Sequence, residues 1–136
     1  YGFQQEDEAP YEWTTISSLV PTVRDWCQKN LLDQGLLSRF YRVRIMRLKA
    51  GGYISPHIDN HSESRYFRAI NIAINNPRDC IMVFENFGVV PWKSGDVRLL
   101  DISYKHSVSN GASEDRYHLI VHGKFNFCKQ TLEHLL

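Results

Sequence analysis

The sequence predicts a mainly β domain, an antiparallel sandwich or jelly roll, preceded by one helix. Apolar residues recur at three- and four-residue spacing in one stretch, before Gly35. After it come short runs rich in Val, Ile, Tyr and Phe, separated by Gly, Asn, Asp and Pro, which is typical of strands and turns. With 136 residues, 43% of them hydrophobic and 23% charged, the chain can bury a core without disulfides.

The spacing predicts a helix over residues 14–30, with Thr14 or Thr15 placed to cap its start. Pro21 lies inside this range and must either fall in the first turn or kink the helix. We expect the helix to pack on one sheet. Residues 1–13 are acidic and form a poorly defined extension of the single domain that we predict over residues 1–136.

The strands expected after the helix are short and follow one another closely, so we expect each sheet to bury one face against the other. They cover residues 41–49, 67–75, 80–85, 97–100, 106–109 and 117–124. Turns are expected at residues 51–52, 75–77, 94–96 and 110–111, where Gly, Asn and Pro gather. Residues 129–136 could close the chain with a helical turn.

Charge and cysteine content narrow the class of protein. Sixteen Lys and Arg against fifteen Asp and Glu give a net charge of +1, which removes the strongest argument for a nucleic-acid or anionic-membrane surface but leaves local charged patches open. No nucleic-acid partner is expected. Cys27, Cys80 and Cys128 are odd in number and form no Cys-x-x-Cys pair, which indicates reduced thiols and a cytoplasmic location. No apolar stretch approaches the ~20 residues of a membrane span, and the acidic start does not resemble a signal peptide.

His57 and Asp59 follow the Gly51-Gly52 turn and are two residues apart. On an extended segment two such side chains lie on the same face and can share a ligand. The alternative is an aspartate that caps a turn beside a surface histidine. The short motif alone does not separate the two interpretations.

A second histidine, His106, begins a predicted strand, and distant strands can be neighbours in a rolled sheet. Two imidazoles and one carboxylate on one face are the arrangement that holds non-haem Fe(II) and leaves positions open. Zinc uses the same residue types, so these ligands leave redox and hydrolytic chemistry both open.

Arg116 stands at the start of the most apolar predicted strand. A guanidinium at the edge of a buried pocket needs an anion, and its planar fork suits a carboxylate. A dicarboxylic co-substrate would supply one. The alternative is an ion pair at a loop end with Glu114 or Asp115.

From about Arg44 to Lys124 the sequence resembles the aspartyl/asparaginyl β-hydroxylases among the Fe(II)- and 2-oxoglutarate-dependent oxygenases. Four segments with Arg116 behind them carry the resemblance through their order and spacing. They are AGGYISPHID at 50–59, NIAI at 71–74, WKSGD at 92–96 and DISYKHSVSN at 101–110.

The resemblance implies a double-stranded β-helix, a jelly-roll or cupin-like fold, in which His57, Asp59 and His106 bind Fe(II). It also implies that Arg116 binds the distal carboxylate of 2-oxoglutarate, with Asn71 near the keto-acid end and Arg68 assisting. The implied activity is a dioxygenase that uses O2 to hydroxylate an unactivated C–H bond. The favoured substrate is the β-carbon of an Asp or Asn residue in a peptide, or a free amino acid.

Other interpretations stay open. His61 could compete as a metal ligand, although a loop histidine near the pocket is favoured, and His118 and His122 are expected at the surface or behind the ligands. A run of basic residues flanking His57 could meet an acidic substrate or form a solvated strand face. The alternative functions are a cupin-like non-redox zinc or manganese protein, a catalytically inactive jelly-roll binding module and, disfavoured by charge, a nucleic-acid demethylase.

Overall fold

The computed structural model describes residues 12–59 and 69–126, and divides the chain into two compact units. One unit is Val43–His122, and the other joins Tyr1–Arg42 to Gly123–Leu136. The expected C-terminal helical turn, Cys128 and most of the expected N-terminal extension lie outside the described residues. The single domain over 1–136 stays a prediction.

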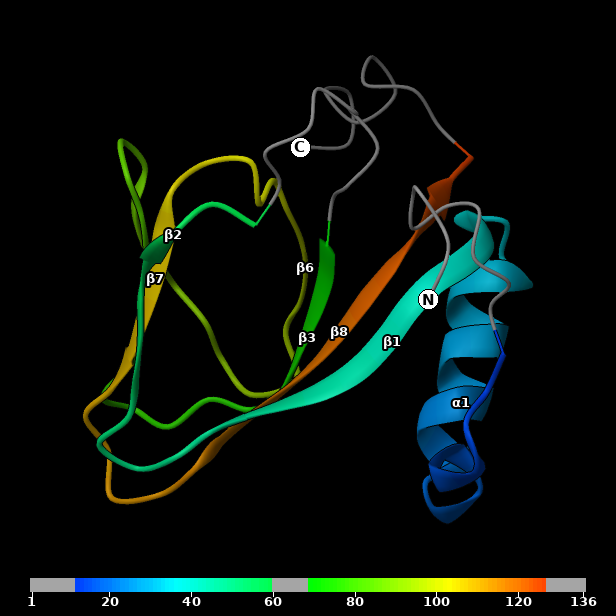
Figure 1. The fold of residues 1–136 in the computed structure, drawn as a ribbon, viewed down its shortest axis with the longest axis horizontal. Coiled ribbons are helices and arrows are strands. Elements are labelled where there is room, and N and C mark those ends of the chain that lie inside the picture. The colour runs from blue at the N-terminus through cyan, green and yellow to red at the C-terminus, as the bar shows by residue number, and fades with distance from the viewer. Residues whose placement is uncertain (1–11, 60–68, 127–136) are drawn as a thin grey trace, which may run out of the picture. The chain divides into compact units, whose positions relative to one another are not determined.

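Two four-stranded sheets make up the β structure (Figure 1). One has the order β1-β8-β3-β6 and the other the order β2-β7-β4-β5. Successive strands therefore alternate between the sheets, except that β4 and β5 pair with each other in one sheet. This is the winding of a double-stranded β-helix, and the predicted mainly β class is confirmed. The strands are β1 (Leu37–Leu48), β2 (Tyr53–His57), β3 (Ala69–Asn75), β4 (Cys80–Phe84), β5 (Gly88–Val90), β6 (Val97–Leu100), β7 (His106–Asn110) and β8 (Arg116–Phe125).

Alternation along the strands builds the core between the two sheets of the larger unit. In β4, Cys80, Met82 and Phe84 are buried, whereas Ile81 and Val83 are exposed. Side chains from both sheets complete the cluster, among them Ala69, Ala73, Leu100 and Val108. On β8 the same rule places Arg116, His118 and Ile120 on one face, and Ile120 packs against this core.

Two strands were not predicted from the sequence. β2 contains Pro56, and β5 is three residues long. Both lie at the edges of their sheet, where proline and short strands are tolerated because one side of the strand makes no ladder hydrogen bonds. The other strands coincide with the predicted ranges to within a few residues, and β6 matches its range of 97–100.

The predicted helix over residues 14–30 is wrong in its extent. A 3₁₀ helix spans Thr15–Leu19, helix α1 spans Pro21–Cys27, and a π-helical turn, Gln28–Leu32, follows. Pro21 occupies the first turn of α1, where its missing N–H costs no hydrogen bond, and thereby separates the two helices. Thr14 precedes the 3₁₀ helix but makes no side-chain capping bond.

Buried apolar side chains of the smaller unit come from the helical segment and from the start of β1. Cys27 and Leu31 are buried, as are Leu37 and Phe40. The ring of Trp13 meets Phe40 edge to face at 5.8 Å between centroids. Trp13, which precedes the 3₁₀ helix, thus contacts the start of β1. That the helix packs on one sheet stays a prediction.

Candidate metal and carboxylate site

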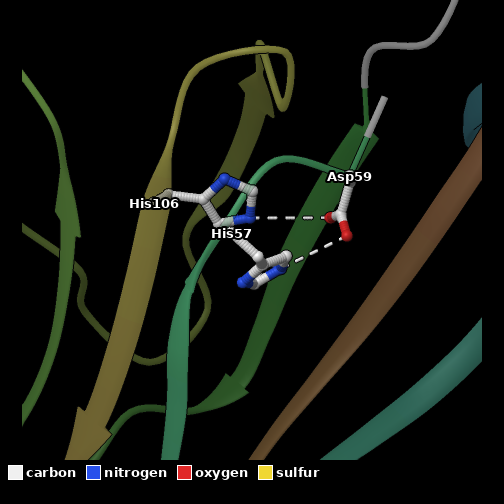
Figure 2. Close-up of side chains that lie close together, drawn as sticks. All are labelled: His57, Asp59 and His106. Carbon is white, nitrogen blue, oxygen red and sulfur yellow. Dashed lines mark ion pairs between the residues drawn. The ribbon is translucent and has the colours of Figure 1, made fainter. Parts of the chain in front are cut away.

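The structure brings together His57, Asp59 and His106 (Figure 2). His57 ends β2 and His106 begins β7, and the two residues are partners in the antiparallel pairing of these strands. The register shifts between Ile54 and His57, an irregularity that redirects the end of β2. Asp59 follows β2, and its backbone N–H donates to the Ile102 carbonyl at 3.3 Å.

The two histidines are held in the same way. His57 Nδ1 donates to the Ser55 carbonyl at 2.7 Å, and His106 Nδ1 donates to the Tyr104 carbonyl at 2.9 Å. These bonds leave both Nε2 atoms facing the carboxylate of Asp59, at 3.2 Å from His57 and 3.5 Å from His106. In the neutral state each Nε2 then carries the lone pair that a metal requires.

Electrostatics couple Asp59 to the imidazoles. The hydrogen bond with His106 is the main cause that lowers the pKa of the Asp59 carboxyl, opposed by burial and aided by the charges of His57, His106 and Arg44. Burial lowers the pKa of His106, but the bonds to Asp59 and to the Tyr104 carbonyl outweigh it, and the net pKa is raised. Asp59 is thus held ionised.

The surroundings differ on the two sides of this cluster. The side chain of His106 is 5% exposed, and its ring stacks on Phe84 at 5.0 Å between centroids. The side chain of Asp59 is 40% exposed and that of His57 is 36% exposed. A cation would therefore be supported from the core by His106 and be reached by solutes from the side of Asp59.

The donor set fits a transition metal. One ligand atom from each of the three residues lies within 4.8 Å of the others. Two neutral imidazole nitrogens with one carboxylate oxygen suit Fe(II), and zinc accepts the same donors. That these residues bind a metal stays a prediction.

Arg116 is buried, 5% exposed, on the inner face of β8. Its Nε donates to Asn76 Oδ1 at 3.4 Å and its Nη2 to His118 Nδ1 at 2.9 Å. The alternative ion pair with Glu114 or Asp115, both of which the structure describes, is not seen. Asp115 instead binds Arg47 at 2.6 Å and the Ala50 backbone N–H at 2.8 Å. Burial lowers the pKa of Arg116, and no carboxylate within the described ranges 12–59 and 69–126 compensates its charge.

His118 is fully buried, which corrects the expectation that it could be a surface residue. It alternates with Arg116 on one face of β8, and its ring meets Trp92 edge to face at 4.8 Å between centroids. Burial, with the charge of Arg116 beside it, lowers the pKa of His118 to about 3. His122 is also buried, at 3% exposed. The i, i+2 spacing from Arg116 was the signal in the sequence that could have placed His118 in the site.

Some of the other residues expected near the site are described by the structure and others are not. Asn71 is buried on β3, on the same face as Ala69 and Ala73, and therefore faces the core. Arg68 and His61 lie outside the described residues. The charge of Arg44, one of the basic run on β1, contributes to lowering the pKa of the Asp59 carboxyl. Cys27 and Cys80 are free and buried.

The described part of the chain contains no helix with the length and apolar character needed to cross a membrane. The cytoplasmic location stays a prediction.

Comparison with known proteins gives a family match. The model of a family described as aspartyl/asparaginyl β-hydroxylase matches residues 9–124. No curated protein matches the chain.

Solved structures include similar chains. A conserved protein with a double-stranded β-helix domain from Klebsiella pneumoniae subsp. pneumoniae is 19% identical with a TM-score of 0.47, over 62% of this chain and 67% of that one. An RmlC-like cupin family protein with a double-stranded β-helix fold from Methanocaldococcus jannaschii is 14% identical with a TM-score of 0.47, over 67% of this chain and 73% of that one.

Proposed function

We propose that this chain, which belongs to the aspartyl/asparaginyl β-hydroxylase family, is an Fe(II)- and 2-oxoglutarate-dependent dioxygenase. In this proposal His57, Asp59 and His106 hold the metal, and Arg116 binds the distal carboxylate of 2-oxoglutarate. Asn71 and Arg68 are proposed to assist at the co-substrate.

One observation supports the proposal above the others. His57 and His106 on one sheet, with Asp59 just after β2, form a cluster that could hold a metal ion. A buried arginine faces the interior from the other sheet. The contacts of Arg116 within the described ranges are with two neutral groups, Asn76 and His118. A buried charge without an opposite charge is costly, and an incoming carboxylate would compensate it.

Hydrogen bonds within the protein orient the proposed metal ligands before any ligand binds. The Ser55 and Tyr104 carbonyls hold the Nδ1–H groups, so that both Nε2 atoms face the position beside Asp59. Such outer bonds orient metal-binding imidazoles and raise their basicity. When bound there, Fe(II) with 2-oxoglutarate supplies the activation of O2 that C–H hydroxylation requires.

The proposed substrate is the β-carbon of an Asp or Asn residue in a peptide, or a free amino acid. Family membership and the C–H chemistry of the proposed cofactors support it. The positive charge of Arg44, which contributes to lowering the pKa of Asp59, would attract an acidic substrate to the exposed side of the cluster.

Anaerobic reconstitution with Fe(II) and 2-oxoglutarate tests the proposal. We expect the visible metal-to-ligand charge-transfer band, followed by succinate production when O2 and a substrate from a screen of amino acids and peptides are added. Tight metal binding without the band would instead favour the cupin-like non-redox protein. Binding of neither metal nor co-substrate would favour the binding module.

A further inference from the structure

Two exposed aromatic side chains contact each other in loops of the larger unit. Phe87 lies in the turn between β4 and β5, and Tyr104 lies in the segment that joins β6 to β7. Their rings meet edge to face at 4.9 Å between centroids, yet the residues are 68% and 46% exposed. Single exposed apolar residues are common on protein surfaces, whereas aromatic residues that gather there are typical of binding sites. We call these two residues the aromatic pair.

The segment that carries Tyr104 also contacts the cluster of His57, Asp59 and His106. The Tyr104 carbonyl accepts from His106 Nδ1 at 2.9 Å, and the Ile102 carbonyl accepts from the Asp59 N–H at 3.3 Å. Tyr104 is two residues from His106, so their Cα atoms lie within roughly 7 Å of each other. The loop between β6 and β7 and the end of β2 lie at the same end of this unit (Figure 1). The aromatic pair is therefore a neighbour of the cluster.

The turn between β4 and β5 holds Phe87 in place. Phe84 and Gly88 are paired at the two ends of this turn, and the Phe87 N–H donates to the Phe84 carbonyl at 3.2 Å. Asn86 and Gly88 have φ angles of 72° and 82°, a region that asparagine and glycine adopt most readily. Because this tight turn restricts the backbone before any ligand binds, less conformational entropy is lost on binding.

The charged side chains beside the aromatic pair neutralise each other. Glu85 lies in the same turn as Phe87, and Lys105 follows Tyr104 in the chain. Their side chains form an ion pair at 3.2 Å, and the Glu85 N–H donates to the Lys105 carbonyl at 2.8 Å. The two rings thus stand beside a neutral ion pair, which favours an uncharged apolar ligand group over a charged one.

We infer that the aromatic pair binds an apolar side chain one or two positions away from the target residue of a peptide. This inference rests on the proposed function, in which the target residue lies beside the metal. In an extended peptide such a neighbour lies within roughly 7 Å of the target residue, the same reach that separates Tyr104 from His106. A free amino acid has no such neighbour, so a peptide is the preferred substrate of the two proposed classes.

Peptides that differ at one position test the inference. The reference is a short peptide with blocked ends, a central Asp and serine elsewhere. In four further peptides one leucine replaces a serine, one or two positions before or after the Asp. Calorimetry on the Zn(II)-loaded protein with 2-oxoglutarate measures their dissociation constants without turnover. We expect at least one leucine peptide to bind roughly 10-fold or more tightly than the reference, because burial of a leucine side chain is favourable.

Variants assign this preference to the aromatic pair. Phe87→Ala should abolish the advantage of the leucine peptide and leave the dissociation constant of the reference peptide unchanged. The matched control is Tyr53→Ala, which removes a side chain that is 75% exposed at the start of β2 and should leave the preference intact. Both side chains are mostly exposed, so neither change should affect folding.

Four results would overturn the inference. They are equal binding of all five peptides by the parent, tighter binding of free aspartate than of any peptide, an undiminished preference in Phe87→Ala, and an equal loss in Tyr53→Ala. The aromatic pair could instead join two copies of the chain. The sedimentation coefficient of the parent would then rise with protein concentration while that of Phe87→Ala would not, and this result would also overturn the inference.

NMR on the unaltered protein gives a readout that no variant can disturb. The methyl protons of the bound leucine should show nuclear Overhauser contacts with the ring protons of Phe87 and Tyr104, and their absence in the complex would contradict the inference. The charge-transfer band with Fe(II) and 2-oxoglutarate tests the proposed function separately. If the band forms and no leucine peptide is preferred, the inference fails while the proposed function stands. If the band does not form, both fail.

Discussion

His57 and His106 stand opposite each other on β2 and β7, and each donates its Nδ1–H to the backbone carbonyl two residues earlier in the chain. Their rings lie 4.4 Å apart between centroids at 53°. These two hydrogen bonds orient both rings so that their Nε2 atoms face the Asp59 carboxylate. Strand pairing sets the distance between the two imidazoles, and local hydrogen bonds set their rotation.

Metal binding should depend on His106. His106→Ala removes one of the three ligands and should weaken Fe(II) binding more than the roughly 100-fold typical of the loss of an outer-shell partner. Anaerobic calorimetry measures this loss. The control is Lys105→Ala, which alters the exposed neighbour paired with Glu85. Undiminished iron binding in His106→Ala would show that the ligands are wrongly assigned.

Arg116 should control the co-substrate but not the metal. Arg116→Ala removes the buried guanidinium and should raise the dissociation constant of 2-oxoglutarate by at least roughly 10-fold, because a charge-assisted contact is lost. The Fe(II) affinity should be unchanged. Titration of the charge-transfer band measures the co-substrate. Arg47→Ala is the matched control, since that exposed arginine pairs with Asp115. Loss of iron binding in Arg116→Ala would contradict the division of roles.

His118 should make stability depend on pH. Its pKa is about 3 in the folded protein, below the ordinary value of 6.5, because of burial and the charge of Arg116. Between these two pKa values His118 is protonated in the unfolded chain but neutral in the folded chain. The stability linked to His118 is present above about pH 6.5 and is lost toward pH 3, by about 1.4 kcal/mol for each pH unit.

Urea denaturation of the metal-free protein between pH 7.5 and 4.5 measures this effect. The unfolding free energy of the parent should fall more steeply with decreasing pH than that of His118→Asn, whose amide does not titrate. The difference between the two slopes isolates His118 from the carboxylates that both proteins share. Equal slopes would mean that the ring is charged or accessible in the folded state.

A charged side chain at position 110 should destabilise the fold. Its side chain is buried, and its Nδ2 donates to the carbonyls of Leu48, Lys49 and Glu114 at 2.9 to 3.2 Å, while its Oδ1 accepts from the Ala112 N–H. Asn110→Asp would set a carboxylate against three carbonyl oxygens. We expect a loss of about 3 kcal/mol in the free energy of unfolding at pH 7.

The loss from Asn110→Asp should shrink in acid. Because its surroundings disfavour the charged form, the folded pKa of the new carboxyl should lie above the unfolded value, and protonation relieves the repulsion as the pH falls through it. Urea denaturation at pH 7 and pH 5 compares the two states. The exposed neighbour Ser109, changed to Ala, is the control and should stay near the parent. A penalty that grows in acid would refute the account.

Local patterns in the sequence determined the mainly β class, the position of most strands and the identity of the residues now found together. In β4 the alternation of Cys80, Met82 and Phe84 with exposed residues is visible in the sequence because a strand repeats every two residues. The motif that begins at His57 and the strand that begins at His106 were likewise recognisable. The family resemblance added the expectation that these residues bind one metal ion together.

Only the tertiary structure decided how these residues meet. The register between β2 and β7, the burial of His118 and its bond to Arg116 depend on strands distant in the chain, and no local period carries that information. The same reason explains the missed edge strands. The helix, in contrast, is divided at Pro21, a local feature of the sequence. The sequence identifies which residues can bind a metal or an anion. The hydrogen-bond partner of each of their polar atoms is decided by packing between segments that are distant in the chain.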